Sequence, residues 1–346
     1  MVGEDAGDGL NGVDGAVTAH IPVLLEEVMA TLALSSGDIV VDGTFGGGGY
    51  TRAFLQAEAV TVIGFDRDPS AVAAANELIA SSDGRFTFHS APFSTMAERI
   101  AGAVDAVVLD IGVSSMQIDD AARGFSFQGD GPLDMRMSAA GGRELEPVPT
   151  AAQLVNTLAE EKLANLIYQL GDERRSRAIA RAICHRRQEA LFTRTGDLAA
   201  VIARAYGRPP KDGRNPATRT FQALRIAVND ELGELVRGLY AAESLLRPGG
   251  RLVVVSFHSL EDRLVKRFFA SRSGKQAGNS RHLPELQQID QPTFQIVNQR
   301  ALAPGNQEMA RNPRARSAKL RWGLRTGAPV GSADFASLGL PEWDRA

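Results

Sequence analysis

The sequence predicts an α/β protein with a doubly wound, mostly parallel sheet and an inserted all-helical domain. Three observations carry this prediction. Short β-branched runs alternate with helical patterns from residue 39 to residue 109, which is typical of parallel sheets. A glycine-rich turn follows the first of these runs. No strand pattern then recurs before residue 251, although helical patterns fill much of that interval.

The glycine-rich turn predicts a ligand loop. Residues 39–50 read Ile-Val-Val-Asp-Gly-Thr-Phe-Gly-Gly-Gly-Gly-Tyr, so a buried strand ends in Asp42 and enters five glycines among eight residues. Glycine permits positive φ and lets a ligand approach the main chain closely. A flexible linker is the alternative, but linkers are usually longer and richer in serine.

The remaining elements follow in order. A helix is expected over 20–34, and strands over 39–41, 60–65, 85–89 and 105–109, with a helix over 70–80. Helices over 151–170, 173–187 and 194–205 come next. The α/β pattern resumes with a helix over 223–246, a strand over 251–257 and a helix over 259–269, and the segments 293–297 and 316–322 are expected to pair at the edge.

These patterns predict a discontinuous domain organisation. Residues 19–137 and 219–325 form the core, and residues 138–218 form the helical insertion after a stretch rich in Gly, Pro and Glu. Residues 1–18 are expected to be a disordered tail and residues 326–346 a loose C-terminal tail.

Composition excludes several classes of protein. The 346 residues are 44% hydrophobic and 23% charged, and no apolar window is long enough to span a bilayer. The single cysteine, Cys184, excludes a disulfide framework, and five histidines without ligand spacing predict no metal site. We therefore expect a cytoplasmic protein without a membrane partner. The formal net charge of -3 gives no global argument for nucleic acid, so local arginine clusters matter more.

An acid at the tip of the second strand indicates the type of ligand. Asp66 lies about twenty residues past the glycine loop, where a carboxylate suits the hydroxyls of a ribose. The loop has no register that fits G-x-G-x-x-G, which disfavours a pyrophosphate and favours S-adenosylmethionine over a nicotinamide dinucleotide. A dinucleotide oxidoreductase remains the alternative.

Several longer motifs are more specific than the loop. They occupy residues 20–28, 41–49, 65–69, 109–115, 123–136, 216–222, 256–263 (Ser-Phe-His-Ser-Leu-Glu-Asp-Arg) and 312–317. In these stretches the chain resembles the bacterial small-subunit (16S) ribosomal RNA cytosine-N4 methyltransferases. The resemblance implies a Rossmann-like, S-adenosylmethionine-dependent methyltransferase that modifies a cytosine of 16S ribosomal RNA near the decoding centre, at the P site.

Carried over by position, the resemblance implies a donor site made of Gly48, Gly49, Tyr50, Asp66, Phe93, Asp110 and Gln117. The family usually has histidine where Tyr50 and Asn215 stand. At Tyr50 a backbone contact with the donor is therefore expected to survive, whereas Asn215 weakens any catalytic role for that position.

The chemistry requires a group that orients the cytosine amine and accepts its hydrogen bonds, because the amine lone pair is delocalised into the ring. Asp110 is the candidate acceptor, with His258 and Ser114 as further candidates and Phe125 or Phe127 as a stacking aromatic. Each has a structural alternative: Asp110 as a loop tether, His258 as a core histidine and the phenylalanines as core residues.

Arginines supply the expected RNA contacts, because guanidinium groups suit phosphates and stack on bases. The candidates are Arg174, Arg181, Arg219, Arg225, Arg314 and Arg316. A solvated helix face is the alternative for the first two. The helical insertion could clamp RNA or form a homodimer contact. A non-enzymatic assembly factor is a third functional hypothesis, although the loop, Asp66 and Asp110 are all retained.

Overall fold

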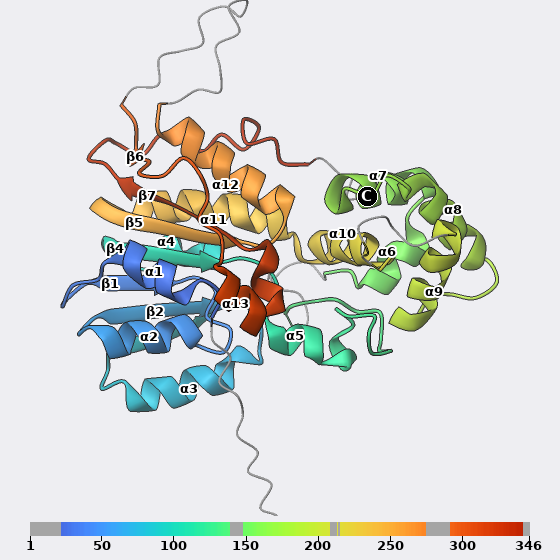
Figure 1. The fold of residues 1–346 in the computed structure, drawn as a ribbon, viewed down its shortest axis with the longest axis horizontal. Coiled ribbons are helices and arrows are strands. Elements are labelled where there is room, and N and C mark those ends of the chain that lie inside the picture. Colours follow the sequence, from blue (N-terminus) through green and yellow to red (C-terminus); the bar gives the residue numbers. More distant parts are fainter. Residues whose placement is uncertain (1–21, 139–147, 208–212, 214, 275–290, 342–346) are drawn as a thin grey trace, which may run out of the picture.

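A seven-stranded sheet organises the part of the chain that the structure describes, which comprises residues 22–138, 148–207, 213, 215–274 and 291–341 of a computed structural model. The strand order is β3-β2-β1-β4-β5-β7-β6 (Figure 1). The strands are β1 (Ile39–Asp42), β2 (Thr61–Asp66), β3 (Phe86–Ser90), β4 (Val104–Asp110), β5 (Leu246–Ser256), β6 (Phe294–Gln295) and β7 (Lys319–Arg325). The first five are parallel, and β7 is antiparallel to both β5 and β6. The predicted fold class is confirmed.

The strand order reverses at β1, which lies between β2 and β4. In doubly wound sheets such a switch point leaves a crevice beyond the carboxyl ends of the two central strands. Asp42 pairs with Val108, so Asp42 and Asp110 lie at the same edge of the sheet. The topology thus brings the glycine loop and the end of β4 together.

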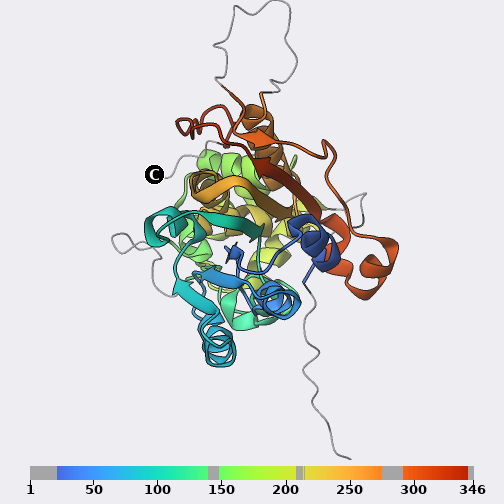
Figure 2. The same cartoon turned by 90° about the vertical axis from the view of Figure 1, so that its left-hand side faces the viewer.

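Helices cover both faces of the sheet, as Figure 2 shows. Alternate strand residues divide between two hydrophobic clusters: Val40 and Val108 belong to one, and Val41 and Leu109 to the other. The first cluster includes α1 (Leu25–Leu32), α2 (Gly49–Ala57) and α3 (Ala71–Ser81). The second includes α4 (Met96–Arg99), α11 (Glu231–Leu245) and α12 (Ser259–Arg272).

A group of helices lies at one end of the molecule, to the right in Figure 1. It comprises α6 (Ala151–Thr157), α7 (Glu160–Gly171), α8 (Ser176–Arg186), α9 (Thr195–Tyr206) and α10 (Thr218–Asn229). Helix α7 packs against α8 and α10, and α8 against α9. Their apolar residues join the second hydrophobic cluster of the sheet. The expected absence of strands holds for residues 148–207, while the domain boundaries themselves remain a prediction.

Two predicted helices are each divided in the structure. The helix expected over 151–170 is α6 and α7, and that over 223–246 is α10 and α11. The second break falls at Asp230, which has φ 50 and whose carboxylate folds over Gly233, where a Cβ would lie 2.6 Å away. Hydrophobic periodicity continues through such a break, so the sequence pattern did not reveal it.

The chain terminates in shorter elements. Helix α13 (Asn306–Arg311) and the 3-10 helix η3 (Pro313–Ser317) precede β7, which pairs with β6 as predicted. Within residues 326–341, Leu338 is fully buried and its carbonyl accepts a 2.8 Å hydrogen bond from Arg267. The predicted N-terminal tail lies outside the described residues. None of the described helices has the length and apolar character needed to cross a membrane.

Candidate active site

The glycine loop is shaped by the space around its main chain. Gly48 has φ 77, and a Cβ there would lie 2.7 Å from the Phe45 ring. Phe45 is itself buried and stacks on Phe86 with 5.3 Å between ring centroids. A Cβ at Gly43 would lie 2.4 Å from a Leu109 methyl group. The loop therefore needs glycine both for its conformation and for close contact with the neighbouring strands.

Asp42 ties this loop to α2. Its carboxylate accepts hydrogen bonds from the Thr51 hydroxyl at 2.7 Å and from the Thr44 N–H at 3.2 Å. Complete burial is the main cause that raises the pKa of Asp42 to about 6, against the opposing effect of these hydrogen bonds. The side chain thus fixes the glycine loop against α2.

Asp66 lies at the end of β2 and faces the same loop. One carboxylate oxygen accepts the Gly46 N–H at 2.7 Å, and the other accepts the Asp68 N–H at 2.8 Å. Burial raises the pKa of Asp66. Each carboxylate oxygen has a second lone pair, so Asp66 can position the loop and still accept a hydroxyl.

Asp110, at the end of β4, carries a buried oxygen with no partner. Its Oδ1 makes no hydrogen bond to any described residue. Burial, followed by repulsion from Asp42 and Glu261, raises the pKa of Asp110 well above its ordinary value. A buried polar atom without a partner is uncommon and marks a position where a ligand can bind.

The segment after β4 is held by a capping network. Ser114 is the N-cap of α5 (Ser115–Asp119): its hydroxyl accepts the Gln117 N–H, and the Gln117 side chain accepts the Ser114 N–H. The Gln117 amide also donates to Asp68 at 2.5 Å, and Arg123 donates to both oxygens of Asp68. Ser114 and Gln117 are thus structurally engaged beside Asp110, which favours a positioning role for their side chains.

Gly49, Tyr50 and Phe93 adjoin the loop in different ways. Gly49 begins α2, so its backbone belongs to the loop margin. The Tyr50 hydroxyl donates to the Val23 carbonyl, and the ring is buried next to Phe54. Phe93 lies between the loop and α11, where a Cβ at Gly238 would lie 2.2 Å from its ring. Tyr50 can therefore offer a ligand its backbone, while Phe93 is positioned by Gly238.

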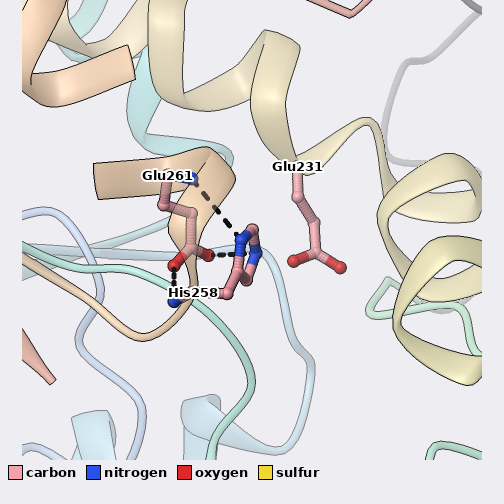
Figure 3. A group of neighbouring side chains, drawn as sticks. All are labelled: Glu231, His258 and Glu261. Carbon is pink, nitrogen blue, oxygen red and sulfur yellow. Dashed lines mark hydrogen bonds and ion pairs between the residues drawn. The ribbon is translucent and has the colours of Figure 1, made fainter. Parts of the chain in front are cut away.

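His258 lies between two glutamates that the sequence analysis did not identify, Glu231 and Glu261 (Figure 3). His258 is the N-cap of α12: its Nδ1 accepts the Glu261 N–H at 3.4 Å, and its Nε2 lies 3.0 Å from Glu261 Oε1. Glu261 is fully buried, and its carboxylate accepts hydrogen bonds from the backbone N–H groups of Phe257 and His258. A glutamate three residues after an N-cap is the capping-box signal that could have identified Glu261.

Within the described residues, this cluster is also the one group with the spacing of a metal site. Its protein contacts argue against that use. Because Nδ1 accepts a hydrogen bond, the ring proton belongs on Nε2, which then has no lone pair for a metal. Arg225 donates to both carboxylate oxygens of Glu231, at 2.7 and 2.8 Å. Glu231 is therefore already paired with Arg225, while His258 Nε2 and Glu261 Oε1 are buried 3.0 Å apart without a hydrogen bond.

The aromatic candidates are largely structural. Phe125 is buried, with the Arg123 guanidinium 5.7 Å from its ring centroid. Phe127 makes an edge contact with Phe221 at 5.0 Å. Neither contact identifies a free stacking platform.

The arginine candidates separate by exposure. Arg174 and Arg316 are exposed, and Arg181 is 79% exposed and 3.6 Å from Glu160. Arg219 lies 4.0 Å from Glu173. Arg314 pairs with Asp119 at 2.6 Å, joining η3 to α5. Arg225 is only 16% exposed and is paired with Glu231, so its guanidinium is not available to RNA.

The chain is similar in sequence to a known protein family and to named bacterial proteins. The chain matches the MraW methylase family over residues 17–325. It is 56% identical to the ribosomal RNA small subunit methyltransferase H of Caulobacter sp. (strain K31), over 91% of this chain and 95% of that protein. It is 53% identical to the protein of the same name from Sinorhizobium medicae (strain WSM419), over 98% of this chain and 96% of that protein. The chain belongs to the MraW methylase family.

Proposed function

We propose that this protein transfers a methyl group from S-adenosylmethionine to the N4 amine of a cytosine in small-subunit (16S) ribosomal RNA, near the decoding centre. Relatives that match nearly the whole chain are named for small-subunit ribosomal RNA methylation, which supports the substrate class. The choice of base and position rests on the motif resemblance. In this proposal residues 19–137 and 219–325 form the catalytic core, with the inserted helical domain between them.

The observation that carries the proposal is the unpartnered Oδ1 of Asp110 at the switch point of the sheet. The N4 amine is a weak nucleophile, so its protons need an acceptor that also holds the nitrogen in line with the methyl group. The Oδ1 atom of Asp110 is free to accept such a hydrogen bond, and the Asp110 backbone N–H donates to Thr44 in the glycine loop. The amine cation that results is strongly acidic, so positioning contributes more than a strong base.

The donor would lie on the glycine loop and supply the electrophilic methyl group. The main chain of Gly48, Gly49 and Tyr50 would contact it, and Asp66 would accept its ribose hydroxyls. Phe93 would lie beside the adenine, and Gln117 would hold α5 against this pocket through Asp68. His258 would contact the cytosine or its phosphate from the neighbouring end of β5.

The direct test is transfer of a labelled methyl group to unmethylated small ribosomal subunits, with naked 16S ribosomal RNA in parallel. We expect label in N4-methylcytosine with the wild type and its loss with Asp110→Ala. Glu77→Ala, an exposed acid on α3, is the matched control and should retain activity. If the wild type binds the donor but transfers no label, the cytosine N4 amine is not the group that receives the methyl group. Failure to bind the donor would favour an assembly factor. Light scattering of the same samples tests the homodimer.

A further inference from the structure

A positively charged cavity lies outside the donor site, between the helical group and α12. Its volume is about 860 Å³. Four arginines and two tyrosines contribute to its lining: Arg174, Arg219, Arg263, Arg267, Tyr168 and Tyr206. We call this site the arginine cavity. The elements that line it are far apart in sequence, as the colours of α7 and α12 in Figure 1 show.

Part of the charge in the arginine cavity is already compensated, because Arg219 lies 4.0 Å from Glu173 and Arg267 donates to the Leu338 carbonyl. Its one acidic lining residue, Asp172, already accepts a 2.9 Å hydrogen bond from the Ser259 hydroxyl. Arg174 and Arg263 are exposed and make no ion pair with the rest of the described chain. A hollow lined by one sign of charge concentrates the electrostatic potential and attracts a ligand of the opposite sign. The arrangement therefore favours an anionic occupant.

The aromatic residues narrow the type of anion. Tyr168 is 55% exposed, so its ring is open to a planar group. Tyr206 has the Arg175 guanidinium 4.8 Å from its ring centroid, which supports one face of the ring. Arginine forks bind phosphates, and exposed aromatic rings stack on unpaired bases. Together these features suit single-stranded RNA better than an acidic peptide or an inorganic ion.

The arginine cavity adjoins the first turn of α12, which follows β5 just beyond the point where Val255 pairs with Asp110. Leu260, in the first turn of α12, lines it, and His258 is the N-cap of the same helix. The Ser259–Asp172 hydrogen bond joins this turn to the end of α7. An RNA strand with its target base beside Asp110 would thus pass the start of α12 and reach these arginines.

We propose that the arginine cavity binds nucleotides that flank the target cytosine, with phosphates on Arg174 and Arg263 and a base stacked on Tyr168. This inference rests on the proposed function, since it presumes an RNA substrate. It assigns to α12 a part in substrate binding that the sequence analysis did not foresee. The helix would carry His258 at its first turn and Arg263 and Arg267 one and two turns later.

The test compares Arg174→Ala, Arg263→Ala and the double variant with Lys266→Ala. Lys266 is an exposed cation on the same helix that does not line the cavity. For the double variant we expect KM for small subunits to rise about tenfold or more, and the slope of log affinity against log salt to become shallower by about one to two. The kcat and the calorimetric affinity for S-adenosylmethionine should be retained. Tyr168→Ala should weaken RNA binding more than Tyr168→Phe, because phenylalanine preserves stacking.

The double variant decides the inference separately from the proposed function. Suppose that the wild type transfers methyl groups normally and that the double variant has the same KM and salt slope as the wild type. The arginine cavity would then not be an RNA site. If the wild type transfers no methyl group, filter binding of labelled 16S ribosomal RNA replaces KM, and equal affinities for both proteins would overturn the inference. A change in oligomeric state with unchanged RNA affinity would instead assign the cavity to contact between two copies.

Discussion

The Thr44 hydroxyl accepts a 2.7 Å hydrogen bond from the backbone N–H of Asp110. This contact joins the loop after β1 to the end of β4, across 66 positions of sequence. The group expected to hold the donor and the group expected to hold the acceptor are thereby attached to each other. In the proposed mechanism, the alignment of the two reactants would depend on this hydroxyl.

Thr44→Val tests this positioning role. Valine keeps the shape but leaves the Asp110 N–H without its acceptor, which costs about 1–3 kcal/mol of unfolding free energy. We expect kcat for methyl transfer to fall more than the affinity for S-adenosylmethionine. Urea unfolding and steady-state kinetics measure the two effects. Thr87→Val, at an exposed position of β3, is the control, and equal kcat values for the two variants would contradict the role.

The rate should depend on the ionisation of Asp110. Burial raises the pKa of its carboxyl, so at low pH the group is protonated and cannot accept both hydrogen bonds required of it. We expect kcat/KM to rise with pH as Asp110 loses its proton. Asp110→Asn should lower the rate about a hundredfold and remove this rise. A pH profile of the variant parallel to that of the wild type would exclude Asp110 as the titrating group.

Asp42 should make the protein less stable as the pH rises from about 4 to about 6. The pKa of Asp42 is about 6 in the folded state, against an ordinary value of 3.8 that applies to the unfolded chain. Between these values the folded state retains a proton that the unfolded state has lost. The free energy of unfolding therefore falls through this window, by about 3 kcal/mol from Asp42 alone. Urea unfolding at several pH values should show a smaller fall in Asp42→Asn. The exposed Glu77→Gln should leave the fall unchanged.

Gly48→Ala should damage donor binding, whereas Gly249→Ala should not. The two glycines have similar φ, 77 and 84, so both alanines strain the backbone. Only at Gly48 does the added Cβ meet a neighbour, the Phe45 ring at 2.7 Å, while nothing lies within 4 Å at Gly249. Calorimetry should therefore give a weaker affinity for S-adenosylmethionine in Gly48→Ala alone. Equal affinities would show that the loop tolerates a shift of Phe45.

Arg225 should contribute to the stability of the fold and not to RNA binding. Its removal in Arg225→Met leaves Glu231, a buried carboxylate, without its bidentate partner, which costs about 3–5 kcal/mol. The exposed pair of Arg194 and Asp130 is the comparison, and Arg194→Met should shift the denaturant midpoint far less. Denaturant midpoints measure both. If Arg225→Met reduced RNA affinity without loss of stability, Arg225 would instead be an RNA-binding residue.

Much of the donor side of the site could be predicted from local sequence. A β-branched run ending in an acid and followed by glycines describes β1 and its loop with little dependence on the rest of the chain. The same holds for Asp66 and Asp110, because parallel strands align their carboxyl ends at one edge of the sheet. Site roles for these residues remain predictions, but their placement follows from strand order.

Other features of the site could be recognised only in the folded chain. The identity of the partner of Arg225 could not be read from residues 219–231, because periodicity continued through Asp230 and concealed the break between α10 and α11. Likewise, no local pattern indicated that Glu231 and Glu261 would enclose His258.

The sequence by itself therefore determined the α/β class, the ligand loop and the acids at the strand ends, because each depends on residues close together in the chain. Only the tertiary structure decided which charges are buried in pairs, such as Arg225 with Glu231, and which remain exposed, such as Arg174 and Arg263. The physical reason is that ionic contacts between distant segments depend on how helices pack against the sheet, and neither composition nor periodicity encodes that distance.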